Sequence, residues 1–550
     1  MSVESSSLAA PADAAPSSRT APHVGEGQVV WTLWLTYGAF YFCRTNISAA
    51  VAADPGLTTS VSAGGLGLSE LQVGWILASL KISYGIGQFL NGQLSERLPP
   101  RFLLAMGMFG SAGLNILFGL GTGFYFLLFV WACNGYFQSL GWTPCMRVVG
   151  NWIPIRRRGK AVGLIGTGYQ VTLGLTYLVS SQAVELFGTW RAALFVPSAL
   201  LVAGGLTMLL LLKERPEQTG DAGDEGGWRA SSAAHSAPPR TTVRETLYVT
   251  LFNPALWLMG LSLALLNACR YGYLDWGLKH LKHVQNVGVG NAGLKYGFIA
   301  LGAAAGAYLA GWATDRFFDG RRAPVMTGLL VLLAILSLAY EAIAPYSSVG
   351  TVVLLVAIGF CIFGPQVLLV GTAPADLAHR NTAAAAAGFV NFAGYLGAAA
   401  GDIVTGYFVD EAHGGWQVAI RIWAGWALAA AVFTALLWNA SQKRLFLLPG
   451  LVPKSAGLAA MATAAWAVHA GPYPEWALGI VLAGAFGMAA AFLIRKAAGA
   501  GLAAASFAVL FLFASYVQQS DASVAWHLAT AIGGCAIGII TSLMVLVDER

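Results

Sequence analysis

Apolar segments of about twenty residues recur along the chain and alternate with short polar loops. Each segment is long enough to cross a bilayer as an α-helix, since about twenty residues at 1.5 Å of rise per residue span the hydrocarbon core. Twelve such spans are predicted before residue 440, in two groups of six. The first group covers 29–50, 70–92, 101–120, 123–147, 159–183 and 190–213. The second group covers 254–280, 294–317, 323–344, 349–374, 383–409 and 416–440.

The polar stretches divide the chain into five parts. Residues 1–28 lack a basic start followed by an apolar core, so they are expected to be a disordered cytoplasmic tail and not a cleaved signal. Residues 214–247 form a charged, Gly-, Ser- and Pro-rich cytoplasmic linker between an N-terminal six-helix bundle (29–213) and a C-terminal one (248–444). Residues 445–550 hold about four more apolar segments, which predict an accessory membrane segment that could bind a membrane partner.

Composition agrees with an all-α integral membrane protein. The 550 residues are 57% hydrophobic and only 10% charged, and the mean hydropathy is +0.65, whereas about a quarter of a soluble domain is charged. The net charge of +6 is too small to indicate nucleic-acid binding. Lys and Arg gather in the loops at 96–101, 153–160 and 315–324, so these loops and both termini are predicted to be cytoplasmic, in a bacterial inner membrane. One loop, near 279–295, breaks this rule.

The two groups of spans repeat one another. "GQLSER" (92–97) leaves the second span as "GWATDR" (311–316) leaves the eighth, and "FCRTN" (42–46) matches "ACRYG" (268–272). Two six-helix halves related by an axis along the membrane normal resemble the plan of the major facilitator superfamily, in which substrate binds between the halves.

The repeat pairs Arg44 in the first span with Arg270 in the seventh. Each lies about sixteen residues from the start of its helix, hence at a similar depth, roughly 20 Å from the cytoplasmic face. Because the planar guanidinium group donates two hydrogen bonds at once, two such groups facing each other predict a phosphate site. Two alternatives remain open: Arg44 could extend to the lipid headgroups, and Arg270 could be neutralised by Asp275.

Polar and aromatic side chains share helical faces near these arginines, which favours a wet pocket over a lipid-facing surface. They are Tyr37 and Tyr41 in the first span, Lys81, Tyr84 and Gln88 in the second, and Gln138 and Trp142 in the fourth. The tyrosines could equally be packing residues or interfacial anchors. Asp402, in the eleventh span, could relay protons or simply line a polar cavity.

Four segments resemble the organophosphate:phosphate antiporters, the family of the glycerol-3-phosphate and hexose-6-phosphate transporters. They are "YFQSLGWTPCMRVVGNW" (136–152), "RYGYLDW" (270–276), "GFCIFGPQVLLVG" (359–371) and "AAGFVNFAGYLGAAAG" (386–401). The resemblance covers residues 29–440 and implies a rocking exchanger whose two arginines, matching Arg44 and Arg270, grip a phosphoryl group. It also implies binding roles for the residues that match Tyr37, Tyr41, Tyr84, Gln138, Trp142 and Tyr395.

Three positions depart from the glycerol-3-phosphate branch of that family. Gln88 stands where that branch has a lysine, Tyr169 where it has a histidine, and Thr45 where it has a basic residue. With fewer cations around the phosphate, glycerol 3-phosphate itself is in doubt as the substrate. We hypothesise that Lys81, about 10 Å along the helix from Gln88, restores one positive charge.

The sequence therefore predicts a secondary transporter that exchanges a phosphorylated small metabolite for inorganic phosphate, without a cofactor or metal. A sugar-phosphate sensor of the same fold, signalling to a membrane kinase, is one alternative. A proton-coupled carrier of another organic anion, with Asp275 and Asp402 as relay candidates, is another. An enzyme is not expected, because the spans show no nucleophile–base or metal-ligand constellation.

Overall fold

The computed structural model describes residues 25–215, 250, 253–318, 320–374 and 383–438. Most of the predicted tail, most of the linker and the predicted accessory segment at 445–550 lie outside these residues. The predicted end of the tail at residue 28 is wrong, because α1 already begins at Glu26. Within them, every predicted span coincides with one helix or with a run of consecutive helices, which confirms the all-helical fold.

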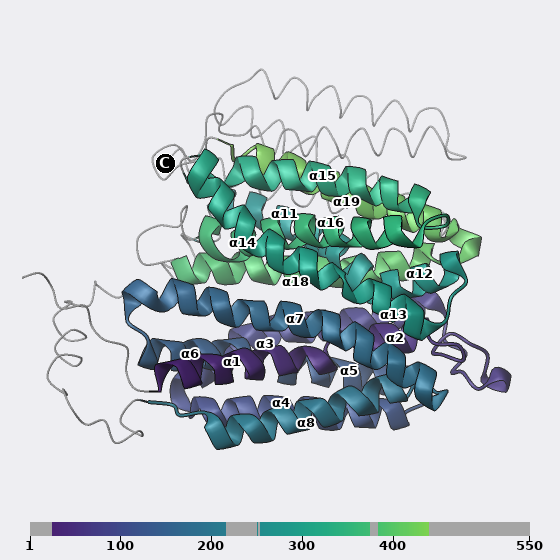
Figure 1. Ribbon diagram of the computed structural model, residues 1–550, viewed down its shortest axis with the longest axis horizontal. Coiled ribbons are helices and arrows are strands. Elements are labelled where there is room, and N and C mark those ends of the chain that lie inside the picture. Colours follow the sequence, from purple (N-terminus) through teal and green to yellow (C-terminus); the bar gives the residue numbers. More distant parts are fainter. Residues whose placement is uncertain (1–24, 216–249, 251–252, 319, 375–382, 439–550) are drawn as a thin grey trace, which may run out of the picture.

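The described helices form two groups that lie side by side, drawn in purple to blue and in teal to green (Figure 1). The N-terminal half contains α1 (Glu26–Phe40), η1 (Tyr41–Cys43), α2 (Ile47–Ala52), η2 (Val61–Ala63), α3 (Glu70–Arg97), α4 (Pro100–Leu120), α5 (Phe124–Gln138), α6 (Trp142–Trp152), α7 (Ile155–Phe187) and α8 (Ala192–Leu211). The C-terminal half contains α11 (Pro254–Tyr271), η4 (Gly272–Trp276), α12 (Gly277–Gln285), α13 (Val289–Gly297), α14 (Ile299–Phe317), α15 (Arg322–Ile343), α16 (Ser348–Val367), η5 (Leu368–Thr372), α18 (Ala383–Phe408), η6 (Glu411–His413) and α19 (Gly415–Ala435).

Local signals set several helix starts. Ser69 and Gln72 form a capping box at the start of α3, in which each side chain accepts a hydrogen bond from the other residue's backbone N–H. Asn253 caps α11 and is followed by Pro254 at the first helical position, where the missing N–H of proline costs no hydrogen bond. Seven of the described helical stretches are long and apolar enough to cross a membrane by length and composition.

Five of the twelve predicted spans are interrupted, among them the eighth, in which α13 ends at Gly297 and α14 begins at Ile299. The first changes to a 3₁₀ turn at Tyr41 and resumes as a helix at Ile47, and the fourth is split between Gln138 and Trp142. The seventh and tenth contain the π-helical turns η4 and η5. Such breaks release backbone groups and re-aim side chains, so they are common where a membrane helix lines a site.

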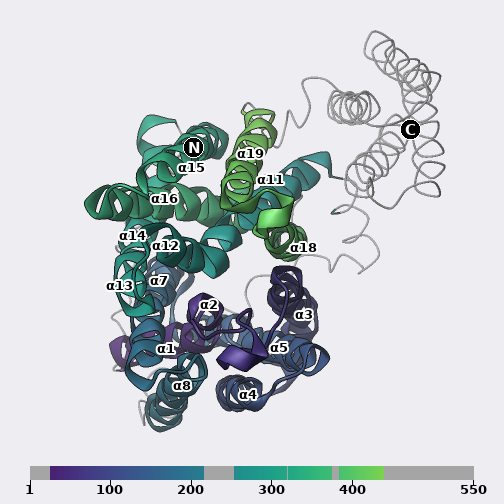
Figure 2. The same cartoon turned by 90° about the vertical axis from the view of Figure 1, so that its right-hand side faces the viewer.

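Each half contributes helices to the contact between the halves: α3 packs against α18, and α7 packs against α13 and α14. We call the end of the molecule at which α12 lies the α12 end, which faces the viewer in Figure 2, and the opposite one the linker end. In the described part of the chain, polar contacts join the halves at the α12 end. Lys279 binds Glu70 there, Tyr177 donates to the carbonyl oxygen of Leu274, and the Gly290 N–H donates to Glu185. The α12 end is therefore closed.

Candidate substrate-binding site

Arg44 lies where the first span is broken, directly after the 3₁₀ turn that follows α1. Its side chain is buried, with 5% of the residue's surface exposed. Nε donates to Gln138 Oε1 at 3.1 Å, and the guanidinium carbon lies 4.7 Å from the ring centre of Tyr41 and 4.4 Å from that of Tyr84. These ring faces stabilise the cation without neutralising it.

A buried network of polar groups fixes Gln138, the last residue of α5. Its amide nitrogen donates to the Phe40 carbonyl oxygen at 3.0 Å and to Ser111 Oγ at 2.7 Å. Ser111 in turn donates to Asn134 Oδ1 at 2.6 Å. Because both amide hydrogens are engaged, the oxygen of Gln138 is turned towards Arg44 and the orientation of the guanidinium group is set by the fold.

Arg270, at the end of α11, is also buried, with 3% of its surface exposed. In the described part of the chain its Nε atom has no hydrogen-bond partner. The guanidinium carbon lies 4.9 Å from the ring centre of Tyr271 and 4.9 Å from that of Phe363. Arg270 therefore carries a full charge and unused donors inside the protein, which is costly unless an anion completes the site.

A chain of aromatic rings connects the two arginines across the halves. Tyr41 stacks on Tyr169 with ring centres 4.9 Å apart, and Tyr169 lies 6.4 Å from Phe363, over which Arg270 is placed. Tyr41 lies within electrostatic range of both guanidinium groups, as does Tyr395. Both arginines are thus enclosed by protein and face a common aromatic interior, unlike a side chain that extends to lipid headgroups.

Other residues predicted from the sequence surround the same interior. Tyr37 contacts Trp142 and Tyr169 at 4.8 and 5.9 Å between ring centres, and Tyr84 meets Tyr395 at 4.6 Å. Gln88 is half-buried one helical turn beyond Tyr84.

The position of Lys81 differs from the one expected if it added a positive charge to the phosphate site. Its ammonium group contacts Asp275 and lies 2.7 Å from Asp402, both carboxylates of the other half. All three side chains are almost completely buried. The structure therefore pairs Asp275 with Lys81 and not with Arg270, and the positive charge of Lys81 is already balanced in this conformation.

Two residues that touch these cations were not singled out from the sequence. Phe363 lies under Arg270, and Tyr271 lies under both Arg270 and Lys81, 4.7 Å from the Lys81 ammonium. Phenylalanine in an apolar span gives no signal of such a role. Tyr271 directly follows Arg270 in the sequence, and that adjacency was the available clue.

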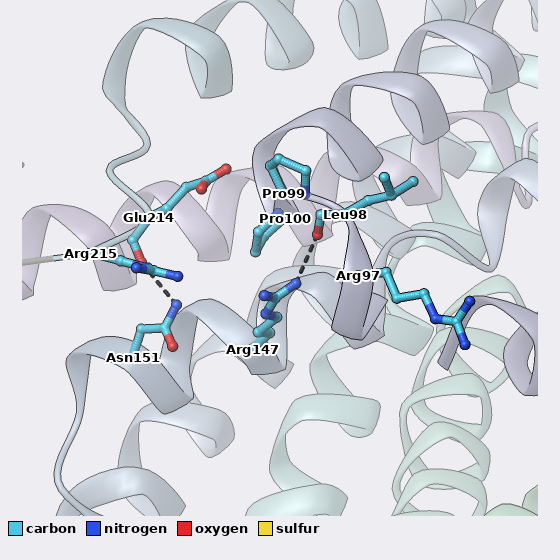
Figure 3. Close-up of a pocket in the computed structure, with 8 residues that line it drawn as sticks. All are labelled: Arg97, Leu98, Pro99, Pro100, Arg147, Asn151, Glu214 and Arg215. Atoms are coloured by element: carbon cyan, nitrogen blue, oxygen red, sulfur yellow. Dashed lines mark hydrogen bonds between the residues drawn. The ribbon is translucent and has the colours of Figure 1, made fainter. Parts of the chain in front are cut away.

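A separate cavity of about 380 Å³ opens at the linker end (Figure 3). Its lining includes Arg97, Arg147 and Arg215, and Arg147 donates to the Leu98 carbonyl oxygen at 2.8 Å. Thirteen residues of α3 separate Arg97 from Tyr84, so this cavity lies roughly 20 Å along the helix from the arginine pair. Arg97 and Arg215 are exposed, as expected of charged groups at a membrane surface.

Residues 33–402 match the family model described as Major Facilitator Superfamily. A glycerol-3-phosphate transporter of Bacillus subtilis is 29% identical over 76% of this chain and 93% of its own length. A protein of Escherichia coli named membrane sensor protein UhpC is 31% identical over 72% of this chain and 89% of its own length. The chain belongs to the organophosphate:phosphate antiporter family of that superfamily. It is therefore an integral, multi-pass membrane protein.

Solved structures give the same fold. A bacterial homologue of the human lysosomal transporter Spinster, in an inward-facing and occupied conformation, aligns with a TM-score of 0.58 over 76% of this chain and 97% of its own, at 16% identity. A D-xylose–proton symporter aligns with a TM-score of 0.56 at 17% identity, over 76% of this chain and 99% of its own. At these identities the likeness concerns the fold alone.

Proposed function

We propose that this protein exchanges a phosphorylated small metabolite for inorganic phosphate across the membrane by alternating access. The supporting observation is the pair of buried guanidinium groups, Arg44 and Arg270, which come from different halves and have no carboxylate partner in the described residues. A phosphoryl group offers several acceptor oxygens and about two negative charges, which match two guanidinium forks. The names of the relatives in Bacillus subtilis and in Chlamydia trachomatis, a probable hexose phosphate transport protein, also favour a phosphorylated substrate.

Electrostatics accounts for the exchange in this proposal. In the empty carrier, the two guanidinium groups, which contact no carboxylate in the described residues, repel each other when the halves close around them. A bound phosphate dianion removes this repulsion and makes hydrogen bonds to both halves, so only the loaded carrier changes sides readily. The empty carrier reorients unfavourably, so each ligand carried across the membrane in one direction is followed by a ligand carried in the other direction.

Orientation follows from the positive charges at the linker end. We place the cavity that contains Arg97, Arg147 and Arg215 at the cytoplasmic face, in accordance with the excess of Lys and Arg in cytoplasmic loops. The α12 end then faces the outside of the cell, and the structure corresponds to a carrier that is closed on its outer side. A bacterial cytoplasmic membrane is the location we propose.

A sensor is the second candidate function, because the relative from Escherichia coli with 31% identity is named a membrane sensor protein. A sensor would bind a sugar phosphate without carrying it at an appreciable rate. The two candidates share the site and differ only in flux.

The test is uptake of labelled phosphate into proteoliposomes that contain the purified protein and are preloaded with unlabelled phosphate. We expect rapid exchange by the wild type and near-complete loss in Arg44→Lys and in Arg270→Lys, because lysine keeps the charge but loses the bidentate donors. Arg421→Lys is the matched control, since Arg421 is exposed on α19 and pairs with Glu341. Binding of phosphate without flux by the wild type would identify a sensor. Wild-type exchange by Arg270→Lys would refute the proposed site.

A further inference from the structure

Lys81, Asp275 and Asp402, here called the ion triad, form a buried cluster that the exchange scheme does not use. Lys81 comes from α3 of one half, and the two carboxylates come from η4 and α18 of the other. Asp402 has no exposed surface, and in the described part of the chain neither of its carboxylate oxygens has a hydrogen bond of good geometry. Oδ2 lies 2.7 Å from the Lys81 ammonium, and the Trp276 indole is close to the same carboxylate. With one ammonium and two ionised carboxylates, the triad carries one unit of negative charge in a place without water contact. Such a charge is unfavourable unless another positive charge arrives.

The groups around Asp402 show which positive charges are available to balance the triad. The described charged and titratable groups on α18 and on the elements that pack against it are these: Tyr395 and Tyr407 on α18, Lys81, Tyr84, Glu70 and the exposed Arg97 on α3, Arg270, Cys269 and Tyr271 on α11, Asp275 and Tyr273 on η4, Arg421 on α19, and Glu411 and His413 on η6. Glu70 pairs with Lys279, and Arg421 pairs with Glu341. Lys81 is the cation in contact with Asp402.

The positive charge of Arg270 balances the negative charge of the ion triad only while no ligand is bound. Within the described residues, the fully buried charged side chains are three cations and two carboxylates, leaving aside His280, whose ring nitrogen is bound to the neutral Tyr340 hydroxyl. The empty interior therefore carries one net positive charge. A phosphate dianion that engages both arginines changes this balance to one net negative charge, located at the triad.

We propose that Asp402 takes up one proton when a phosphate dianion binds, so that the carrier moves a proton together with its phosphorylated ligand. The proton comes from water or buffer and bonds to Oδ1, the oxygen that forms no ion pair with Lys81, while Oδ2 keeps its contact with Lys81. The loaded interior is then neutral, which favours closure in a low dielectric. This inference rests on the proposed phosphate site but adds an ion that plain exchange does not require.

Proton counting tests the inference on the purified protein with inorganic phosphate as the probe. Titration calorimetry at about pH 8, where phosphate is mostly a dianion, is repeated in two buffers of different ionisation enthalpy. The difference gives the protons taken up for each phosphate bound. We expect about one proton for the wild type and for Asp402→Glu, and about none for Asp402→Asn, in which Lys81 and Asp275 form a neutral pair.

The outcomes separate the two proposals. If the wild type does not bind phosphate, the proposed function fails. If the wild type binds phosphate without taking up a proton, no group is protonated on binding and the Asp402 inference is overturned. If Asp402→Asn takes up the same proton as the wild type, the proton goes to the ligand or to another group, and the inference is overturned as well. Infrared difference spectra of the wild type provide a readout that needs no variant. Phosphate binding should produce a protonated-carboxyl C=O band, and the absence of this band would also overturn the inference.

Discussion

The replacement Lys81→Met should open the α12 end of the carrier. Methionine has a similar length but no charge, so it leaves Asp275 and Asp402 facing each other without their shared cation. Removing one partner of a buried ion pair costs about 3–5 kcal/mol. Because the pair joins the halves only while the α12 end is closed, this energy shifts the closure equilibrium by roughly two to three and a half orders of magnitude.

A cysteine introduced at Ser181 can report the opening. Ser181 on α7 is buried against Gly293 on α13 of the other half, so Ser181→Cys is shielded while the α12 end is closed. The labelling rate of this cysteine by a bulky maleimide, in a background without reactive cysteines, should rise at least tenfold with Lys81→Met. Lowering the pH should slow it again, because protonation of the two carboxylates removes their repulsion.

Two further variants show whether the charges are responsible. Lys279→Met removes the ion pair with Glu70, whose side chains are 18% and 20% exposed. A pair this close to solvent contributes about 0–1 kcal/mol, so labelling should rise less than about fivefold. Replacing the whole triad with Met and two Asn residues should restore slow labelling. If Lys81→Met labels no faster than the Lys279→Met control, the triad does not hold the α12 end closed.

Two other predictions concern the support of the site. Gln138→Leu removes the acceptor of the Arg44 Nε–H, and a hydrogen bond to a charged group contributes about 1.5–3 kcal/mol. Phosphate binding measured by calorimetry should therefore weaken by about tenfold to a hundredfold, and an unchanged affinity would contradict the role given to this amide. Gly272→Ala places a Cβ 2.5 Å from the Trp423 indole and should cost about 1–3 kcal/mol, seen as a lower melting temperature. Gly425→Ala on α19, where a Cβ meets nothing within 4 Å, is its control and should melt like the wild type.

The sequence predicted the helices well because the length of an apolar run is a strong local signal. It did not predict where helices break. The split between Gln138 and Trp142 contains Gly141, against which the Phe40 ring packs, and that contact comes from a helix about a hundred residues away in sequence. The π-helical turn η4, which begins two residues after Arg270 and contains Asp275, gives no signal in hydropathy.

The burial of Arg44 and Arg270 could be anticipated because the internal repeat pairs them within corresponding spans, and their joint role in binding phosphate stays a prediction. The role of Lys81 could not be anticipated, since its charge was visible in the sequence but its partners were not. Asp275 is almost two hundred residues from Lys81, and Asp402 is farther still. Which carboxylate an ammonium meets depends on how two halves are packed, and no spacing rule within one helix contains that information.

Small residues determine that packing as much as charges do. A Cβ at Gly74 on α3 would lie 2.7 Å from the Asp402 carbonyl oxygen, and one at Gly406 on α18 would lie 2.6 Å from the Glu70 carbonyl oxygen. The two helices therefore approach backbone to backbone, as small residues allow in membranes. Lys81 follows Gly74 by two helical turns, and side chains on a helix lean towards its N-terminus, so the ammonium reaches back to the level of Asp402. At a wider spacing the 2.7 Å contact between Lys81 and Asp402 would be lost, and the charge that we propose a proton to balance would no longer be enclosed. The close contacts at Gly74 and Gly406 thus make the ion pairs of the triad depend on whether the two halves are packed together.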